Sequence, residues 1–114
     1  MTTKQEAVIR LAWEVGFSQP VLGELASRAS KMHEQMWLEQ VANILARHDR
    51  GKTTRLLAKL GQKKLNPSLR LVAAGSSLTP RRLQEWLAEH DHSPGVREAA
   101  QATLAKRPVL VRSA

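Results

Sequence analysis

Ten lysine and arginine side chains stand within residues 47–82 against a single acid, Asp49, and give this stretch a net charge of +9. The residues before it carry a net −1 and those after it a net 0, so the whole-chain charge of +8 is concentrated in the middle third. Clustered cations bind phosphate groups and release the counterions condensed on a nucleic acid. The sequence therefore predicts a polyanion-binding surface made by Arg47, Arg50, Lys52, Arg55, Lys59, Lys63, Lys64, Arg70, Arg81 and Arg82.

Four of these cations are regularly spaced. Lys52, Arg55, Lys59 and Lys63 follow one another at intervals of 3, 4 and 4 residues. On a helix that continued past Gly61, this spacing would place them on one face. Like charges on one face repel each other, and a row of phosphates would relieve that repulsion. A solvated basic face, or one that meets an acidic protein, is the alternative interpretation.

Two histidine–aspartate groups, His48-Asp49 and His90-Asp91-His92, have the residue types of a metal site or an acid–base pair. Each group follows a predicted helix, where a histidine complements the helix dipole and an aspartate begins the next turn. We therefore interpret them as structural and expect no metal and no cofactor. The chain has no cysteine, which excludes disulfides, zinc–thiolate sites and a cysteine nucleophile.

Two further patterns do not indicate catalysis. Gly51-Lys52-Thr53 is similar to the end of a phosphate-binding P-loop but lacks the upstream glycine and strand. The hydroxyls, Ser76 and Ser77 among them, have no triad context. We therefore expect a protein that is not an enzyme.

The segment around Gly16 is similar to the turn of a helix-turn-helix. Ala12, Gly16 and Ser18 hold the small, turn and capping positions, which would make residues 18–28 the recognition helix. That segment carries Arg28 but little positive charge, and it belongs to the net acidic part of the chain. An ordinary helical hairpin is the preferred interpretation, and a helix-turn-helix regulator stays open as an alternative.

The periodicity of apolar residues is helical throughout, with no sustained alternation that would predict a strand. The predicted helices begin near residues 3, 18, 34, 53, 66, 79 and 93, and several open on a Ser, Thr or Asn cap followed by proline. Short helices need neighbours for stability, which favours a compact or stacked arrangement. Trp13, Trp37 and Trp86 occupy helical positions and are expected in the core, leaving few aromatics for base stacking.

An internal repeat relates two parts of the chain. Leu45–Asp49 and Leu87–Asp91 share the pattern Leu-Ala-x-His-Asp at an offset of 42 residues. Arg55 matches Arg97 at the same offset. The shared unit is thus a helix end, a short turn and a second helix with an arginine near its start.

A longer stretch resembles helical repeats of the HEAT and leucine-rich-variant types. The resemblance covers about residues 66–107, with a weaker echo at 41–60, and is carried by Asn66–Ala73, Leu78–Pro80, Leu83–Ala88 and Ser93–Ala100. The last of these has the Pro-x-Val-Arg-x-Ala-Ala turn and helix that such families use. The resemblance implies a minimal array of about two to three units that bury their apolar faces on one another. It implies partners that are proteins or, in some members, the DNA backbone. The cysteine-ligated cluster associated with the leucine-rich-variant family cannot carry over to a chain without cysteine.

These observations predict an all-α fold: a compact bundle of about six to seven short helices, with a HEAT-like array as its more specific form. We expect one domain, residues 1–107, and a tail, residues 108–114. The chain shows no signal-peptide layout and no long apolar run, so we expect a cytoplasmic protein without membrane contact.

The function predicted from these features is a non-enzymatic nucleic-acid-binding module that contacts DNA or RNA phosphates with little sequence specificity. It would act as a small subunit of a nucleoprotein assembly with protein partners. The alternatives are a HEAT-like adaptor for an acidic protein and the helix-turn-helix regulator.

Overall fold

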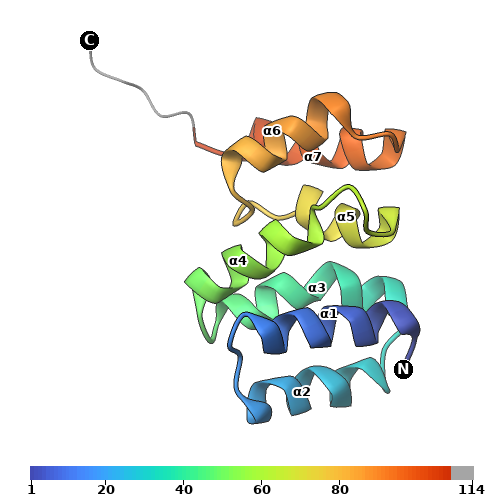
Figure 1. The fold of residues 1–114 in the computed structure, drawn as a ribbon, viewed down its shortest axis with the longest axis vertical. Helices are drawn as coiled ribbons and strands as arrows, with labels where there is room; N and C mark the ends of the chain where they lie inside the picture. The colour runs from blue at the N-terminus through green and yellow to red at the C-terminus, as the bar shows by residue number, and fades with distance from the viewer. Residues whose placement is uncertain (109–114) are drawn as a thin grey trace.

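The computed structural model describes residues 1–108 of the chain and consists of helices joined by short connections (Figure 1). Within that range there are seven α-helices and no strand, which confirms the predicted all-α bundle of six to seven short helices. The helices are α1 (Thr3–Glu14), α2 (Gln19–Ala29), α3 (Glu34–Ala46), α4 (Arg50–Leu60), α5 (Pro67–Ala74), α6 (Arg81–His90) and α7 (Pro94–Lys106). Of the predicted tail, only Pro108 falls within the described part of the chain.

The helices are stacked in levels along the long axis of the molecule (Figure 1). α2 lies at one end, followed by α1 with α3, then α4 with α5, and finally α6 with α7. Consecutive levels touch through α1 against α4 and α5 against α7. The molecule measures 47 × 30 × 21 Å, so the stack is elongated. None of the helices in residues 1–108 is long and apolar enough to cross a membrane.

Polar side chains fix several of the helix starts. Thr2 and Gln5 form a capping box, in which the Thr2 hydroxyl accepts from the Gln5 N–H at 3.3 Å and Gln5 Oε1 accepts from the Thr2 N–H at 2.9 Å. Asn66 and Ser93 cap α5 and α7, as predicted, each with a proline in the first turn. These side chains satisfy N–H groups that the first helical turn leaves without a partner.

Two helix starts differ from the prediction. α4 begins at Arg50 and not at Thr53, because the side chain of Asp49 accepts from the Lys52 N–H at 2.9 Å and caps the helix. Thr79 does not cap α6. It is buried, and its hydroxyl donates to a carbonyl of α5 at 2.6 Å.

The position at which α4 ends also differs from the prediction. The helix ends at Leu60, with Gly61 as its C-cap. Lys63 therefore lies in the connection to α5 and does not continue the helical face of Lys52, Arg55 and Lys59. The expected row of four cations on one helix is reduced to three.

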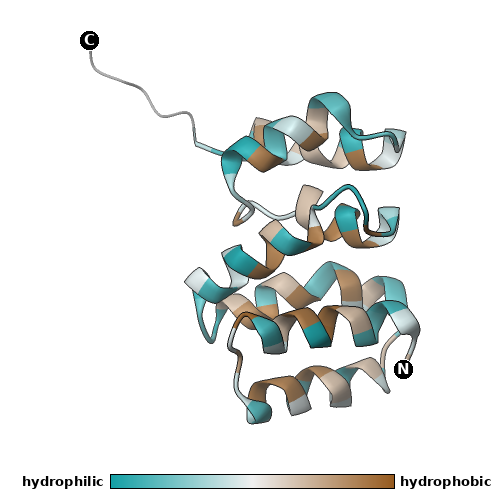
Figure 2. Ribbon diagram, viewed as in Figure 1, coloured by the Kyte–Doolittle hydropathy of each residue, from teal (hydrophilic) through white to brown (hydrophobic). Residues whose placement is uncertain are grey.

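The hydrophobic core runs through the stack of helices, and one of the three tryptophans is fully buried in it. Trp37 is fully buried, and its indole N–H donates to the Leu25 carbonyl at 3.0 Å. Trp86 is half-buried, whereas Trp13 is 63% exposed, so the expectation of three core tryptophans is wrong for Trp13. Figure 2 shows apolar and polar segments alternating along the helices, as in helices that bury one face.

The two Leu-Ala-x-His-Asp segments lie at equivalent places, one at the end of α3 and the other at the end of α6. Their polar contacts differ. Asp49 caps α4, whereas Asp91 accepts from the Ser93 N–H at 2.9 Å and, through its backbone carbonyl, from the guanidinium of Arg97. Arg55, the counterpart of Arg97, is exposed. The two segments thus share a sequence pattern but form different turns, because Asp49 is the N-cap of α4 whereas Asp91 is the C-cap of α6, and the assignment to HEAT-like families stays a prediction.

Gly61 and Gly23 provide a matched pair of tests for the packing between levels. A Cβ at Gly61 would lie 2.7 Å from Leu83 Cδ2 and 3.4 Å from Ala73 Cβ, whereas a Cβ at Gly23, inside α2, meets nothing within 4 Å. We expect Gly61→Ala to lower the free energy of unfolding by about 1–3 kcal/mol through overpacking. Gly23→Ala should raise it by about 0.5–1 kcal/mol, since alanine favours the helix.

Urea unfolding followed by circular dichroism measures both changes. An equal gain in stability for the two variants would show that α6 does not press on the end of α4.

Candidate nucleic-acid interface

α4 presents a basic face to solvent. Lys52, Arg55 and Lys59 recur at intervals of 3 and 4 residues, which places them on one side of the helix. The other side is buried in the core and consists of Leu56, Leu57 and Leu60. Because the leucines fix the rotation of α4, its cations are held toward solvent.

Six further cations lie around α4. They are Arg47 and Arg50 at the turn into α4, Lys63 and Lys64 in the α4–α5 connection, and Arg81 and Arg82 at the start of α6. Five are exposed and Arg81 is half-buried. α4 and α6 belong to neighbouring levels (Figure 1). The side chain of Leu83 on α6 lies close to Gly61 at the end of α4. We call these six residues, together with Lys52, Arg55 and Lys59, the basic surface.

Acidic neighbours neutralise little of the basic surface. Lys52 Nζ lies 3.9 Å from Asp49 Oδ2, and Lys59 Nζ lies 3.8 Å from Glu14 Oε2. All four side chains are 35–43% exposed, and ion pairs in such solvated positions contribute little. The other seven cations form no ion pair within residues 1–108. The basic surface therefore keeps most of its positive charge.

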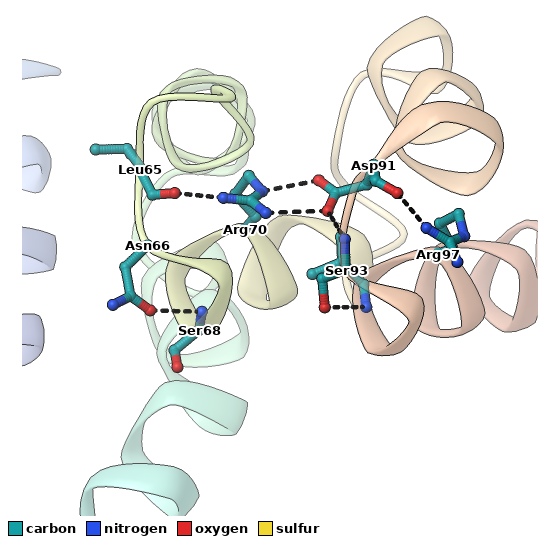
Figure 3. Close-up of polar contacts among 8 residues, drawn as sticks. Leu65, Asn66, Ser68, Arg70, Asp91, Ser93 and Arg97 are labelled. Carbon is teal, nitrogen blue, oxygen red and sulfur yellow. Dashed lines mark hydrogen bonds and ion pairs between the residues drawn. The ribbon is translucent and has the colours of Figure 1, made fainter.

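Arg70, the tenth cation of the predicted set, does not belong to this surface. Its guanidinium is buried and forms two hydrogen bonds with Asp91, from Nε to Oδ2 at 2.8 Å and from Nη2 to Oδ1 at 3.0 Å (Figure 3). Its third nitrogen donates to the Leu65 carbonyl. Because Arg70 is buried and all three of its guanidinium nitrogens already donate to protein oxygens, it is not available to a ligand and is not part of the basic surface.

Asp91 is ionised in this environment. Burial disfavours its carboxylate and is the strongest single influence on its pKa. The hydrogen bonds from Arg70 and from the Ser93 N–H, with the charges of Arg70 and His92, together outweigh burial and lower the pKa of Asp91 below its ordinary value. The hydrogen bond to Asp91 raises the pKa of Arg70, against the effect of burial. The pair is thus a bidentate ion pair in the interior, the strong form of such contacts.

The sequence held one signal for the role of Arg70. α5 and α7 both begin with Pro-x-x-Arg, which places Arg70 and Arg97 at the same position of the two helices. Both arginines donate to Asp91, one to its side chain and the other to its backbone carbonyl (Figure 3). A charge count treats Arg70 as one more cation, whereas the repeated position indicates a structural arginine.

The first histidine–aspartate group has structural partners. His48 Nε2 lies 3.2 Å from Glu24 Oε2, and Asp49 caps α4. Nowhere in the described residues do three His, Asp or Glu side chains gather closely enough to hold a metal ion.

α2, the recognition helix of the helix-turn-helix alternative, offers little positive charge. Its single cation is Arg28, whose Nη2 lies 3.3 Å from Glu24 Oε1. Glu24 is also the partner of His48. The surface of α2 is therefore less suited to phosphates than the basic surface.

A groove of about 430 Å³ lies between α3, α5, the α5–α6 connection and α7. Leu71, Val72 and Leu78 contribute apolar side chains, and Ser76 and Ser77 contribute hydroxyls. Glu39 is the one ionisable residue in its lining. The groove thus lacks the cations that a phosphate needs, and none of its lining residues belongs to the basic surface.

No protein-family model, curated protein or solved structure matches the chain.

The Arg70–Asp91 pair predicts a large difference between the two repeated aspartates. Asp91→Asn removes the charge that balances a buried guanidinium and should cost about 3–5 kcal/mol of unfolding free energy. Asp49→Asn is the matched control, because asparagine also caps helices and the lost pair with Lys52 is solvated, so its effect should stay within about 0.5 kcal/mol. Denaturant unfolding of both variants measures the difference. Equal effects would contradict the structural role given to Asp91.

The same pair predicts a pH dependence. Since the pKa of Asp91 is lowered in the folded protein, its contribution is complete above the unfolded value of about 3.9 and is lost as pH falls through the folded value. The stability gap between the wild type and Asp91→Asn should therefore be constant near neutral pH and shrink below about pH 4. Urea unfolding at a series of pH values tests this. A gap that persists undiminished into strong acid would exclude an ionised Asp91 as its source.

Proposed function

We propose that this chain is a non-enzymatic nucleic-acid-binding module that contacts phosphates through the basic surface. The observation that carries the proposal is that few acidic side chains neutralise that surface. Nine cations lie on α4, its two flanking connections and the start of α6, and within residues 1–108 two of the nine form an ion pair with an acid. A folded protein gains little from holding like charges together, because they repel. A polyanion relieves the repulsion and gains entropy from released counterions.

The side chains of the basic surface favour binding without strong sequence preference. Lysine and arginine contacts to phosphates position a nucleic acid but do not read its bases. Outside the basic surface, α2 has one cation, Arg28, which is paired with Glu24, so a groove-reading role for α2 has less support.

A role as a small subunit in a nucleoprotein assembly is part of the proposal. The groove between α3, α5 and α7, with its apolar side chains and hydroxyls, is suited to a protein contact at a place without cations. The same groove supports the second candidate function, a HEAT-like adaptor whose basic surface meets an acidic protein.

Salt-dependent binding tests the proposal. Affinity for a labelled oligonucleotide, measured by fluorescence anisotropy, should fall steeply as salt rises from about 50 to 200 mM. The double variant Arg55→Ala with Lys63→Ala should bind more weakly at every salt concentration. It should also flatten the slope of log K against log salt by roughly 1.4–1.8, the loss of about two phosphate contacts.

The matched control removes two cations near the starts of α1 and α3, Lys4→Ala with Lys31→Ala, neither of which belongs to the basic surface, and alters the net charge equally. It should leave the slope nearly unchanged. No binding of DNA or RNA at low salt would rule the proposal out, and equal losses in both double variants would show that net charge alone is responsible.

A further inference from the structure

One aromatic side chain stands at the edge of the basic surface. Trp86 lies on α6 and is half-buried, and the ammonium of Lys63 lies 6.0 Å from the centre of its ring. The ring of His90 lies 5.8 Å from that of Trp86, tilted by 47°. Trp86 therefore has both a cation and a second aromatic ring as neighbours.

The position of Trp86 on α6 brings a further cation close. Arg82, Trp86 and His90 follow at intervals of 4 residues, so they form one row along the helix. Arg82 belongs to the basic surface and is exposed. This side of α6 thus carries one cation followed by two aromatic rings.

The row on α6 is continuous with α4. Leu83, one turn before Trp86, lies close to Gly61 at the end of α4. Two residues beyond Gly61, Lys63 reaches the ring of Trp86. Lys63 thus connects the end of α4 to Trp86.

We propose that the ligand of the basic surface is a single-stranded nucleic acid, with one base stacked on Trp86 while Lys63, Arg82 and the cations of α4 hold the neighbouring phosphates. The proposal rests on the proposed function and specifies its substrate class. Single-strand binders combine a cationic track with aromatic rings on which bases stack. In a duplex the bases are stacked on each other and their faces are covered, so Trp86 would gain no partner. The contact of Lys63 with the ring is long and solvated, and a base can take its place while Lys63 turns to a phosphate.

Trp13 offers an internal comparison. It is more exposed than Trp86, at 63%, but it lies on α1, none of whose residues belongs to the basic surface. Exposure alone would select Trp13 for stacking, whereas a cation close to the ring, as Lys63 is to Trp86, selects Trp86.

The test compares oligothymidylate and oligouridylate of about twelve nucleotides with a duplex of the same length, each labelled and titrated at low salt. Trp86→Leu should weaken binding of the single strands by about 5- to 150-fold, the range for loss of one stacked base. It should leave duplex affinity and the salt slope unchanged. Trp86→Phe retains a ring and should recover most of the loss, and Trp13→Leu should bind like the wild type.

In the Trp13→Leu background, single strands should quench tryptophan fluorescence, and Trp86→Phe should abolish the quenching. An oligodeoxyuridylate arm of the same length shares its base with oligouridylate and differs from it only in the sugar, so it distinguishes DNA from RNA.

The outcomes separate the two proposals. If the protein binds none of the oligonucleotides, the proposed function and this inference are both overturned. Binding that responds to Arg55 and Lys63 but is the same in Trp86→Leu, Trp13→Leu and the wild type leaves the proposed function standing and overturns the role of Trp86. A loss in Trp86→Leu that is equal for duplex and single strand, or that Trp86→Phe does not recover, overturns it as well.

Discussion

The buried ion pair between Arg70 and Asp91 is the contact on which the upper half of the stack depends. It joins α5 to the turn between α6 and α7, and the same aspartate orders that turn through Ser93 and Arg97. Taking two charges out of water is costly, and here the cost is offset by bidentate geometry and additional hydrogen bonds. Loss of either Arg70 or Asp91 would leave the charge of the other buried without a counter-charge. The levels α4–α5 and α6–α7 are therefore held in one relative position.

That fixed position has a functional consequence. The candidate surface extends over α4, its flanking connections and α6, which belong to two different levels. Lys63 comes from one level and Trp86 from the next, and their proximity depends on how the levels are stacked. A cation buried in the interior, Arg70, thus helps to align the exposed cations of the basic surface.

The sequence predicted the helices well because their signals are local. Proline after Asn66 and Ser93 marks two starts, and apolar periodicity marks the buried faces. The errors come from contacts over longer distances. Asp49 extends α4 by capping it, and Thr79 donates to α5 in place of capping α6. The basic segment could be identified from composition alone, but composition could not separate Arg70 from the exposed cations, because its partner lies 21 residues away.

The central claim is that phosphates meet α4, its flanking connections and the start of α6. Amide chemical-shift mapping with a short oligonucleotide tests this most directly, because it reports which backbone positions change on binding. The account predicts that the largest changes cluster at residues 47–64 and 81–86, with small changes in α2 and around the groove between α3, α5 and α7. Changes concentrated in α2 or in that groove, with residues 47–64 unaffected, would contradict it.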